Sequence, residues 1–213
     1  MIVGNPSVFA IESEITEAYE RLSFRALGSF VIHIMGRCYG VKEPDASLLA
    51  VSFDEVGRRI ARRGRHTPPF TMDAKAGDIA HAFRRVLYDG CEEGELFFGM
   101  PDPQFHTAIS SSRLQWAPDG DEAFDDGSYV LHFEDKNRVR LIAYKSIDRN
   151  NDLDPSYDTA SLRDVWLSQN DFYEILQNWR SRFEAEWEQL PKIPMNQDGP
   201  ELNSDLNGEE HHA

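Results

Sequence analysis

Apolar and polar side chains alternate over residues 8–15, where Phe9, Ile11 and Ile15 fall on one side. A period of two predicts a β-strand with one face in solvent. Residues 29–35 form a more continuous apolar run bounded by glycines, which predicts a second and more buried strand.

Two further strands are predicted on either side of a turn at 134–137. Residues 129–133 form the first strand and 138–145 the second, in which Arg138 and Arg140 alternate with apolar residues. This pattern predicts a β-hairpin with one buried face, and we expect the face that carries the arginines to lie on the protein surface in contact with solvent.

Helical patterns follow the first two strands. Ser52 lies three positions before Glu55, which is the spacing of a capping box, and Gly64 is a suitable helix end. A second helix is predicted over 76–88, with Gly90 as its stop.

The clearest helix comes last and follows a short predicted strand at 165–167. Ser168 lies three positions before Asp171, which predicts an N-terminal cap. Large apolar residues then recur at helical spacing and predict a stripe that docks on a sheet. These residues are Phe172, Ile175, Leu176, Trp179, Phe183 and Trp187.

Strands and helices are mixed without a βαβ rhythm, which predicts an α+β fold, with an antiparallel sheet and helices packed on one face. We expect one domain over 1–190 and a disordered acidic tail over 191–213. Residues 91–128 show little regular pattern. Such a long loop is either functional or contains short elements that the pattern does not reveal.

Composition narrows the class of protein. No apolar run approaches the ~20 residues of a membrane helix, and no secretory signal is visible. Cys38 and Cys91 are too few for a disulfide framework, so we expect a cytoplasmic protein. The net charge of −15 argues against nucleic acid and anionic membranes as ligands. It suits a basic protein partner, although solubility alone would also explain it.

The acidic residues concentrate in 91–128, where Arg113 is the single basic side chain. Aromatic residues are interleaved with these acids, a combination found at protein interfaces. A solvated loop with a few core aromatics is the simpler explanation. The predicted partner-binding residues are Glu92, Glu93, Glu95, Trp116, Asp119, Asp121, Glu122, Asp125 and Asp126.

An arginine cluster provides the only basic patch. It comprises Arg58, Arg59, Arg62, Arg63 and Arg65 on the first predicted helix. These side chains are expected to pair with acids of the same chain. The alternative is an acidic patch on a partner or on a second subunit, which would make a homodimer.

Candidate chemistry is sparse. Glu12 and Glu14 lie on one strand face, about 6.5 Å apart, within the range of a glycosidase pair. The acids from Asp148 to Asp154 suggest a calcium loop, but Leu153 stands where an EF-hand needs glycine. We therefore predict no cofactor, no metal site and no catalytic residues.

Three segments near the acidic region carry a family resemblance. The segments 123–127, 129–134 and 140–145 (AFDDG, YVLHFE and RLIAYK) resemble the immunity protein 42 family. Similarity extends to the opening residues 1–11, to 28–36 and to the last helix. Members are bacterial proteins that neutralise toxins of polymorphic toxin systems, so the resemblance implies a cognate toxin C-terminal domain as partner.

The resemblance implies an immunity protein that neutralises its toxin by stoichiometric occlusion. If the toxin is a nuclease, its cleft would be basic and carboxylates would stand in for phosphates. A second hypothesis is an adaptor or chaperone that binds an effector without neutralising it. A third is a hydrolase that uses either Glu12 and Glu14 or a site in the irregular region 91–128.

Overall fold

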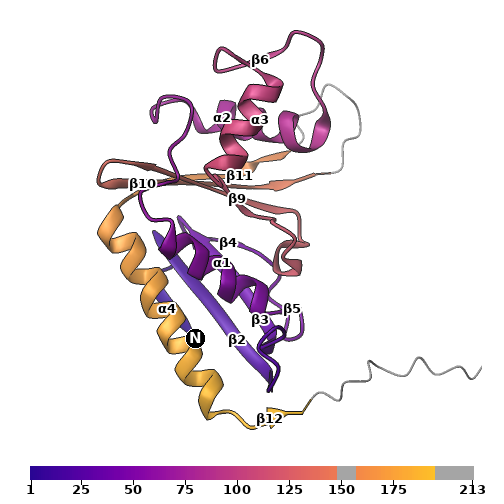
Figure 1. Ribbon diagram of the computed structural model, residues 1–213, viewed down its shortest axis with the longest axis vertical. Helices are drawn as coiled ribbons and strands as arrows, with labels where there is room; N and C mark the ends of the chain where they lie inside the picture. Colours follow the sequence, from indigo (N-terminus) through magenta and orange to yellow (C-terminus); the bar gives the residue numbers. More distant parts are fainter. Residues whose placement is uncertain (148–156, 195–213) are drawn as a thin grey trace, which may run out of the picture.

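The structure is a computed structural model that describes residues 1–147 and 157–194. Its layers are stacked along the long axis (Figure 1). A first sheet with helices α1 and α4 forms the lower part, a second sheet crosses the middle, and α2 and α3 lie above it. The middle sheet therefore separates two hydrophobic cores.

The first sheet confirms the two strands predicted at the start of the chain. Its antiparallel order is β1-β2-β3-β4, β5 pairs with β3, and β12 pairs in parallel with β2. Gly28 is required here, since a Cβ atom would lie 1.9 Å from the Glu14 carbonyl oxygen. The strands are β1 (Ile2–Asn5), β2 (Phe9–Tyr19), β3 (Ala26–Ile34), β4 (Arg37–Tyr39), β5 (Ser47–Leu48) and β12 (Lys192–Ile193).

Helix α4 (Gln169–Gln189) follows the prediction closely. The Ser168 hydroxyl accepts a hydrogen bond from the Asp171 backbone N–H at 3.1 Å and caps the helix. Trp179 and Phe183 from the predicted stripe are fully buried in the lower core, with Phe172 and Leu176. Ile175 and Trp187 pack against the same core with partial exposure.

Helix α1 (Ala50–Ala61) begins differently from the prediction. Its N-cap residue is Leu49, without a side-chain cap, so the capping box at Ser52 was wrong. Ser52 lies inside the helix, and its hydroxyl donates to Asp121 at 2.6 Å. A tertiary hydrogen bond therefore explains a serine that the local pattern assigned to a cap.

The second sheet confirms the hairpin but corrects its environment. Its order is β11-β10-β9-β8, and β11 is much longer than the strand predicted at 165–167. The expectation of a solvent-facing surface was wrong, because Arg140 is only 3% exposed. The strands are β8 (Gln115–Ala117), β9 (Ser128–Asp135), β10 (Arg138–Ser146) and β11 (Tyr157–Ser168).

Arg140 is satisfied beneath the upper layer. Its guanidinium forms an ion pair with Asp164 at 2.7 Å and donates to the carbonyl oxygens of Met72 and Ala74. On the same face, Ile142 and Tyr144 belong to the upper core, whereas Arg138 at the start of the strand is exposed. The upper layer therefore buries most of a strand face that was predicted to meet solvent.

The upper layer contains short elements within the region that showed little pattern. The helix predicted over 76–88 is confirmed as α2 with η1, and Gly90 follows at φ 79°. Phe83 and Phe105 pack edge to face at 5.8 Å in the upper core. The elements of the upper layer are α2 (Ala76–Arg84), η1 (Arg85–Asp89), β6 (Leu96–Phe97), β7 (Met100–Pro101) and α3 (Asp102–Ser111). The short turn η2 (Glu122–Phe124) lies instead against β3 and β5 of the first sheet.

The α+β class with antiparallel sheets and packed helices is confirmed. Within the tail expected over 191–213, Lys192 and Ile193 pair with Ala18 and Tyr19, while 195–213 lie outside the described residues. No helix in 1–147 or 157–194 is long and apolar enough to span a membrane.

Candidate functional site

The acids around η2 form the first group of predicted partner residues. Asp119, Glu122 and Asp125 are exposed, and Asp126 is half-buried in an ion pair with Lys145. The η2 turn lies against the first sheet, where the Val41 N–H donates to the Ala123 carbonyl at 2.7 Å. The exposed carboxylates therefore project from a well-anchored turn.

Two residues predicted in this group belong to the interior. Trp116 is 2% exposed and packs against Phe9 and Phe172 in the lower core, so a partner could not reach it. The Asp121 carboxylate is buried and accepts hydrogen bonds from the Ser52 hydroxyl and the Ala123 N–H. Burial raises the pKa of Asp121 despite these hydrogen bonds, which act to lower it. Both side chains support the turn instead of contacting a partner.

The second group lies beside β6 in the upper layer. Glu92 and Glu93 are exposed, whereas Glu95 forms an ion pair with Arg85 at 2.8 Å. The hydrogen bond from Arg85 holds the pKa of Glu95 below its ordinary value. The sequence treated 91–128 as one acidic segment, but β6 and η2 belong to different layers (Figure 1).

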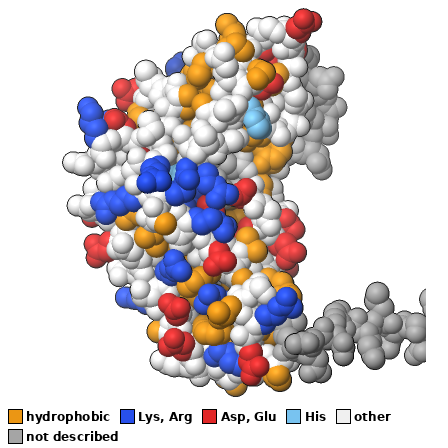
Figure 2. Space-filling model, viewed as in Figure 1, with side chains coloured by type: hydrophobic (Ala, Val, Ile, Leu, Met, Phe, Trp, Pro, Cys, Tyr) orange, Lys and Arg blue, Asp and Glu red, His pale blue; other side chains and the backbone are white. Residues whose placement is uncertain are grey.

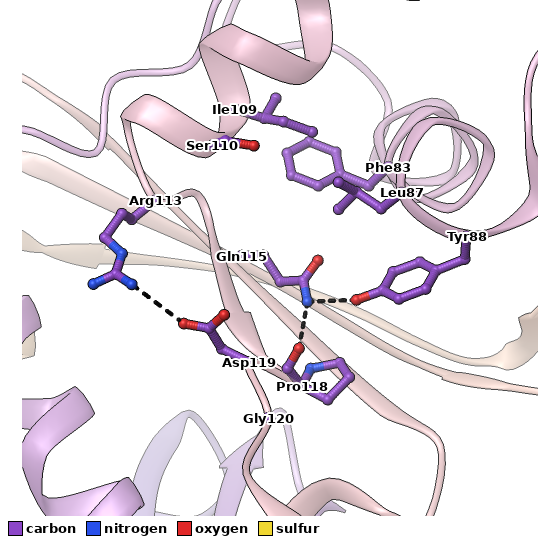
Figure 3. A pocket seen from close by; sticks show the side chains of 10 residues that line it. All are labelled: Phe83, Leu87, Tyr88, Ile109, Ser110, Arg113, Gln115, Pro118, Asp119 and Gly120. Carbon is purple, nitrogen blue, oxygen red and sulfur yellow. Dashed lines mark hydrogen bonds and ion pairs between the residues drawn. The ribbon is translucent and has the colours of Figure 1, made fainter.

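A pocket opens between α2, α3 and the chain around Pro118 (Figure 3), with a volume of about 380 Å³. Gln115 donates from its side-chain nitrogen to the Tyr88 hydroxyl and to the Pro118 carbonyl, both at 2.6 Å. Arg113 and Asp119 face each other at 3.6 Å on one side. The lining residues are Phe83, Leu87, Tyr88, Ile109, Ser110, Arg113, Gln115, Pro118, Asp119 and Gly120.

The pocket is better suited to binding than to catalysis. Its ionisable groups are Tyr88, Arg113 and Asp119, and the latter two form a partly exposed ion pair. Burial raises the pKa of Tyr88, so its phenol stays protonated at neutral pH. The lining residues contain no histidine or cysteine, and Ser110 therefore has no such neighbouring base there. The sequence pattern placed Tyr88 at the end of a predicted helix and gave no sign that it lines a pocket.

One of the two carboxylates suggested for a hydrolase already contacts other side chains of this protein. Glu12 forms an ion pair with Lys42 and a hydrogen bond with His33, each at 2.8 Å, while Glu14 is exposed. Burial acts to raise the pKa of Glu12, but the hydrogen bonds from Lys42 and His33 outweigh it and lower the pKa. A catalytic acid needs a raised pKa, which this environment does not provide.

The arginine cluster divides into buried and exposed members. Arg59 is buried and shares Glu55 with the exposed Arg58, at 3.0 Å and 2.8 Å. Arg62 and Arg63 donate instead to neutral oxygens of α3 and α4. The prediction of pairing with acids of the chain therefore holds for two members. Basic side chains gather over the C-terminal half of α1 on the face shown in Figure 2.

Metal binding finds no support in the described ranges. They contain no group of three or more His, Cys, Asp or Glu side chains arranged to hold an ion. The calcium-like run from Asp148 to Asp154 lies outside the described residues.

The family of the chain follows from its similarity to known proteins. The family model described as immunity protein 42 matches residues 1–182, which extend from β1 into α4. The chain belongs to the immunity protein 42 family. It is therefore an immunity protein, and the expectation drawn from the family resemblance is confirmed.

A solved structure shares the fold of this immunity protein. The crystal structure of CdiI from Burkholderia dolosa AUO158 superposes with a TM-score of 0.51 at 17% sequence identity. The match covers 85% of this chain and 99% of the other. At this identity the likeness concerns the fold alone. No curated protein matches the chain.

Proposed function

We propose that this immunity protein neutralises one cognate toxin domain by forming a 1:1 complex that covers the toxin, without turning over a substrate. The family match over residues 1–182 carries the proposal, because it spans strands β1 to β11 and helices α1 to α3 and extends into α4. By analogy with the CdiI likeness, the toxin would belong to a contact-dependent inhibition system. The complex would form in the cytoplasm of the producing cell.

The exposed acids around η2 are proposed to guide the encounter with the toxin. Asp119, Glu122 and Asp125 extend from a turn that Asp121 and the buried Phe124 hold in place. A preorganised surface loses little conformational entropy on binding. Carboxylates in fixed positions attract a basic partner and speed association. A nuclease, whose phosphate-binding cleft is basic, is the toxin class that fits best.

Co-expression with the toxin tests the proposed function. The probe is the C-terminal domain encoded by the reading frame immediately upstream, produced with and without this chain. We expect survival of the cells only with this chain, and a 1:1 complex by calorimetry. Binding without survival would identify an adaptor instead. Protection at far less than one equivalent, with conversion of the toxin or its product, would identify an enzyme.

Charge reversal tests the acidic group. The triple variant D119K/E122K/D125K should associate at least about 10-fold more slowly and with a weaker dependence on salt. A matched control is E14K/E20K/E43K, which reverses three exposed acids of the first-sheet layer. Equal association rates for the two variants would show that the η2 acids do not guide the toxin.

A further inference from the structure

The β6–β7 hairpin exposes large apolar side chains at the upper end of the molecule. Leu96 is 60% exposed and Phe98 is 36% exposed, although they are only two positions apart. Apolar side chains are visible on the upper part of the face in Figure 2, where Figure 1 places β6. Single exposed apolar residues are ordinary, but a contiguous group marks an interaction site.

The backbone holds Phe98 in an unfavourable conformation. Its φ is 52°, in the left-handed region, and Gly99 follows at φ 81°. A bulky residue is rare in this region, because its side chain crowds the backbone there. Strain of this kind concentrates at functional sites. The hairpin thus keeps an aromatic side chain in an exposed position at an energetic cost.

The Phe98 ring also packs against other aromatic rings of the upper layer. Its centroid lies 4.5 Å from that of Phe70 and 5.8 Å from that of the buried Phe105. Phe98 and Phe70 line a hollow of about 600 Å³ together with Pro68, Pro69 and Thr71. The prolines limit backbone motion beside it. A partner would therefore meet an ordered apolar surface.

The charged residues of the segment that contains the hairpin are all acidic. Residues 91–112 contain four acids and no lysine or arginine. Arg85 neutralises Glu95, whereas Glu92 and Glu93 are exposed without an ion pair among the described residues. An apolar centre with a charged rim is the usual anatomy of a specific protein interface.

We propose that the β6–β7 hairpin is the anchor for the toxin, and that Leu96 and the exposed side of Phe98 pack against an apolar surface of the toxin that is rimmed by basic side chains. The inference rests on the proposed immunity function. A second copy of this chain is a poor occupant, because it would bring Glu92 and Glu93 of two hairpins together in a protein of net charge −15. The anchor determines how slowly the complex dissociates, whereas the η2 acids act on association.

Dissociation kinetics of a matched pair of variants test the anchor. L96S/F98N removes the apolar groups, and asparagine tolerates the left-handed backbone. The control L22S/M35N is closely matched, since Leu22 is 59% exposed and Met35 is 49% exposed with φ 51°. The probe is the upstream-encoded toxin domain in catalytically inactive form, immobilised for interferometry.

We expect L96S/F98N to raise the dissociation rate at least about 30-fold, the range of an interface hot spot. The control should stay within twofold of the unchanged protein. Equal dissociation rates for the two double variants would overturn the anchor while leaving the immunity function intact. Failure of the unchanged protein to form any complex would instead contradict the proposed function itself.

A second measurement uses the unchanged protein, so that its result does not depend on whether the variant folds correctly. Hydrogen exchange with and without the toxin domain should show added protection over residues 92–101. Protection confined to other parts of the chain would overturn the anchor, whatever the behaviour of the variant.

Discussion

Replacing Arg59 with methionine should destabilise the fold, because this buried guanidinium has partners on α1 and on the second sheet. It forms an ion pair with Glu55 at 3.0 Å and donates to the Gln115 carbonyl at 2.6 Å. It also contacts the Arg113 carbonyl at 3.3 Å and the His132 Nδ1 atom at 3.1 Å. R59M would leave these acceptors buried without their donor.

The structure sets the size of the effect. Burial lowers the pKa of Arg59 to about 10, so the side chain is still charged at neutral pH. Removing one partner of a buried ion pair costs about 3–5 kcal/mol. Domains of this size lose roughly 2–4 °C in Tm per kcal/mol, which gives a fall on the order of 10 °C. The loss of about 3–5 kcal/mol is a large part of the unfolding free energy of a typical protein, which is about 5–15 kcal/mol.

Urea unfolding followed by circular dichroism provides the assay. The control is R58M, which removes an arginine paired with the same Glu55, but one whose side chain is 45% exposed. Its expected cost is below about 1 kcal/mol, since solvent screens the pair. If R59M is no more destabilising than R58M, the buried network does not hold α1 to the second sheet.

Three further changes test other parts of the structure. Burial and the nearby positive charge lower the pKa of His66 from 6.5 to about 4, so the unfolded chain binds its proton more readily. Stability should therefore fall by about 3 kcal/mol as pH drops from about 6.5 to 4. H66F should flatten this slope in urea titrations at several pH values, and an unchanged slope would assign it to other groups. G28A should prevent folding, seen as loss of near-UV circular dichroism, because its Cβ would lie 1.9 Å from the Glu14 carbonyl oxygen. G64A, with no atom within 4 Å of its Cβ, should cost about 1 kcal/mol, and equal costs would refute the steric argument. S168A should lower the unfolding free energy by about 1 kcal/mol through loss of the α4 cap, and no change would show that the cap is dispensable.

Local patterns predicted the elements whose determinants are local. The stripe from Phe172 to Phe183 has helical spacing, and the cap at Ser168 depends on a residue three positions away. The hairpin of β9 and β10 is a pairing of neighbouring strands. Each of these signals lies within a short window, so the sequence alone carried it.

The same reasoning failed where a distant element changed the environment. Arg140 lies on a strand face that was expected to be wet, yet Asp164 and two carbonyls of the 72–74 segment satisfy it. Trp116 and Asp121 lie in an acidic, aromatic segment, but the first fills the lower core and the second supports α1 through Ser52. Alternation fixes which residues share a face and leaves open what covers that face.

The sequence by itself determined the family, through segments such as 123–127 and 140–145, and the α+β class, through periodicity. The tertiary structure decided which charges meet solvent, because exposure depends on packing between layers that are distant in sequence. It divided one acidic segment between η2 and the β6–β7 hairpin, and it exposed Phe98 while burying Trp116. Burial is a property of neighbours in space, and no short window of residues encodes it.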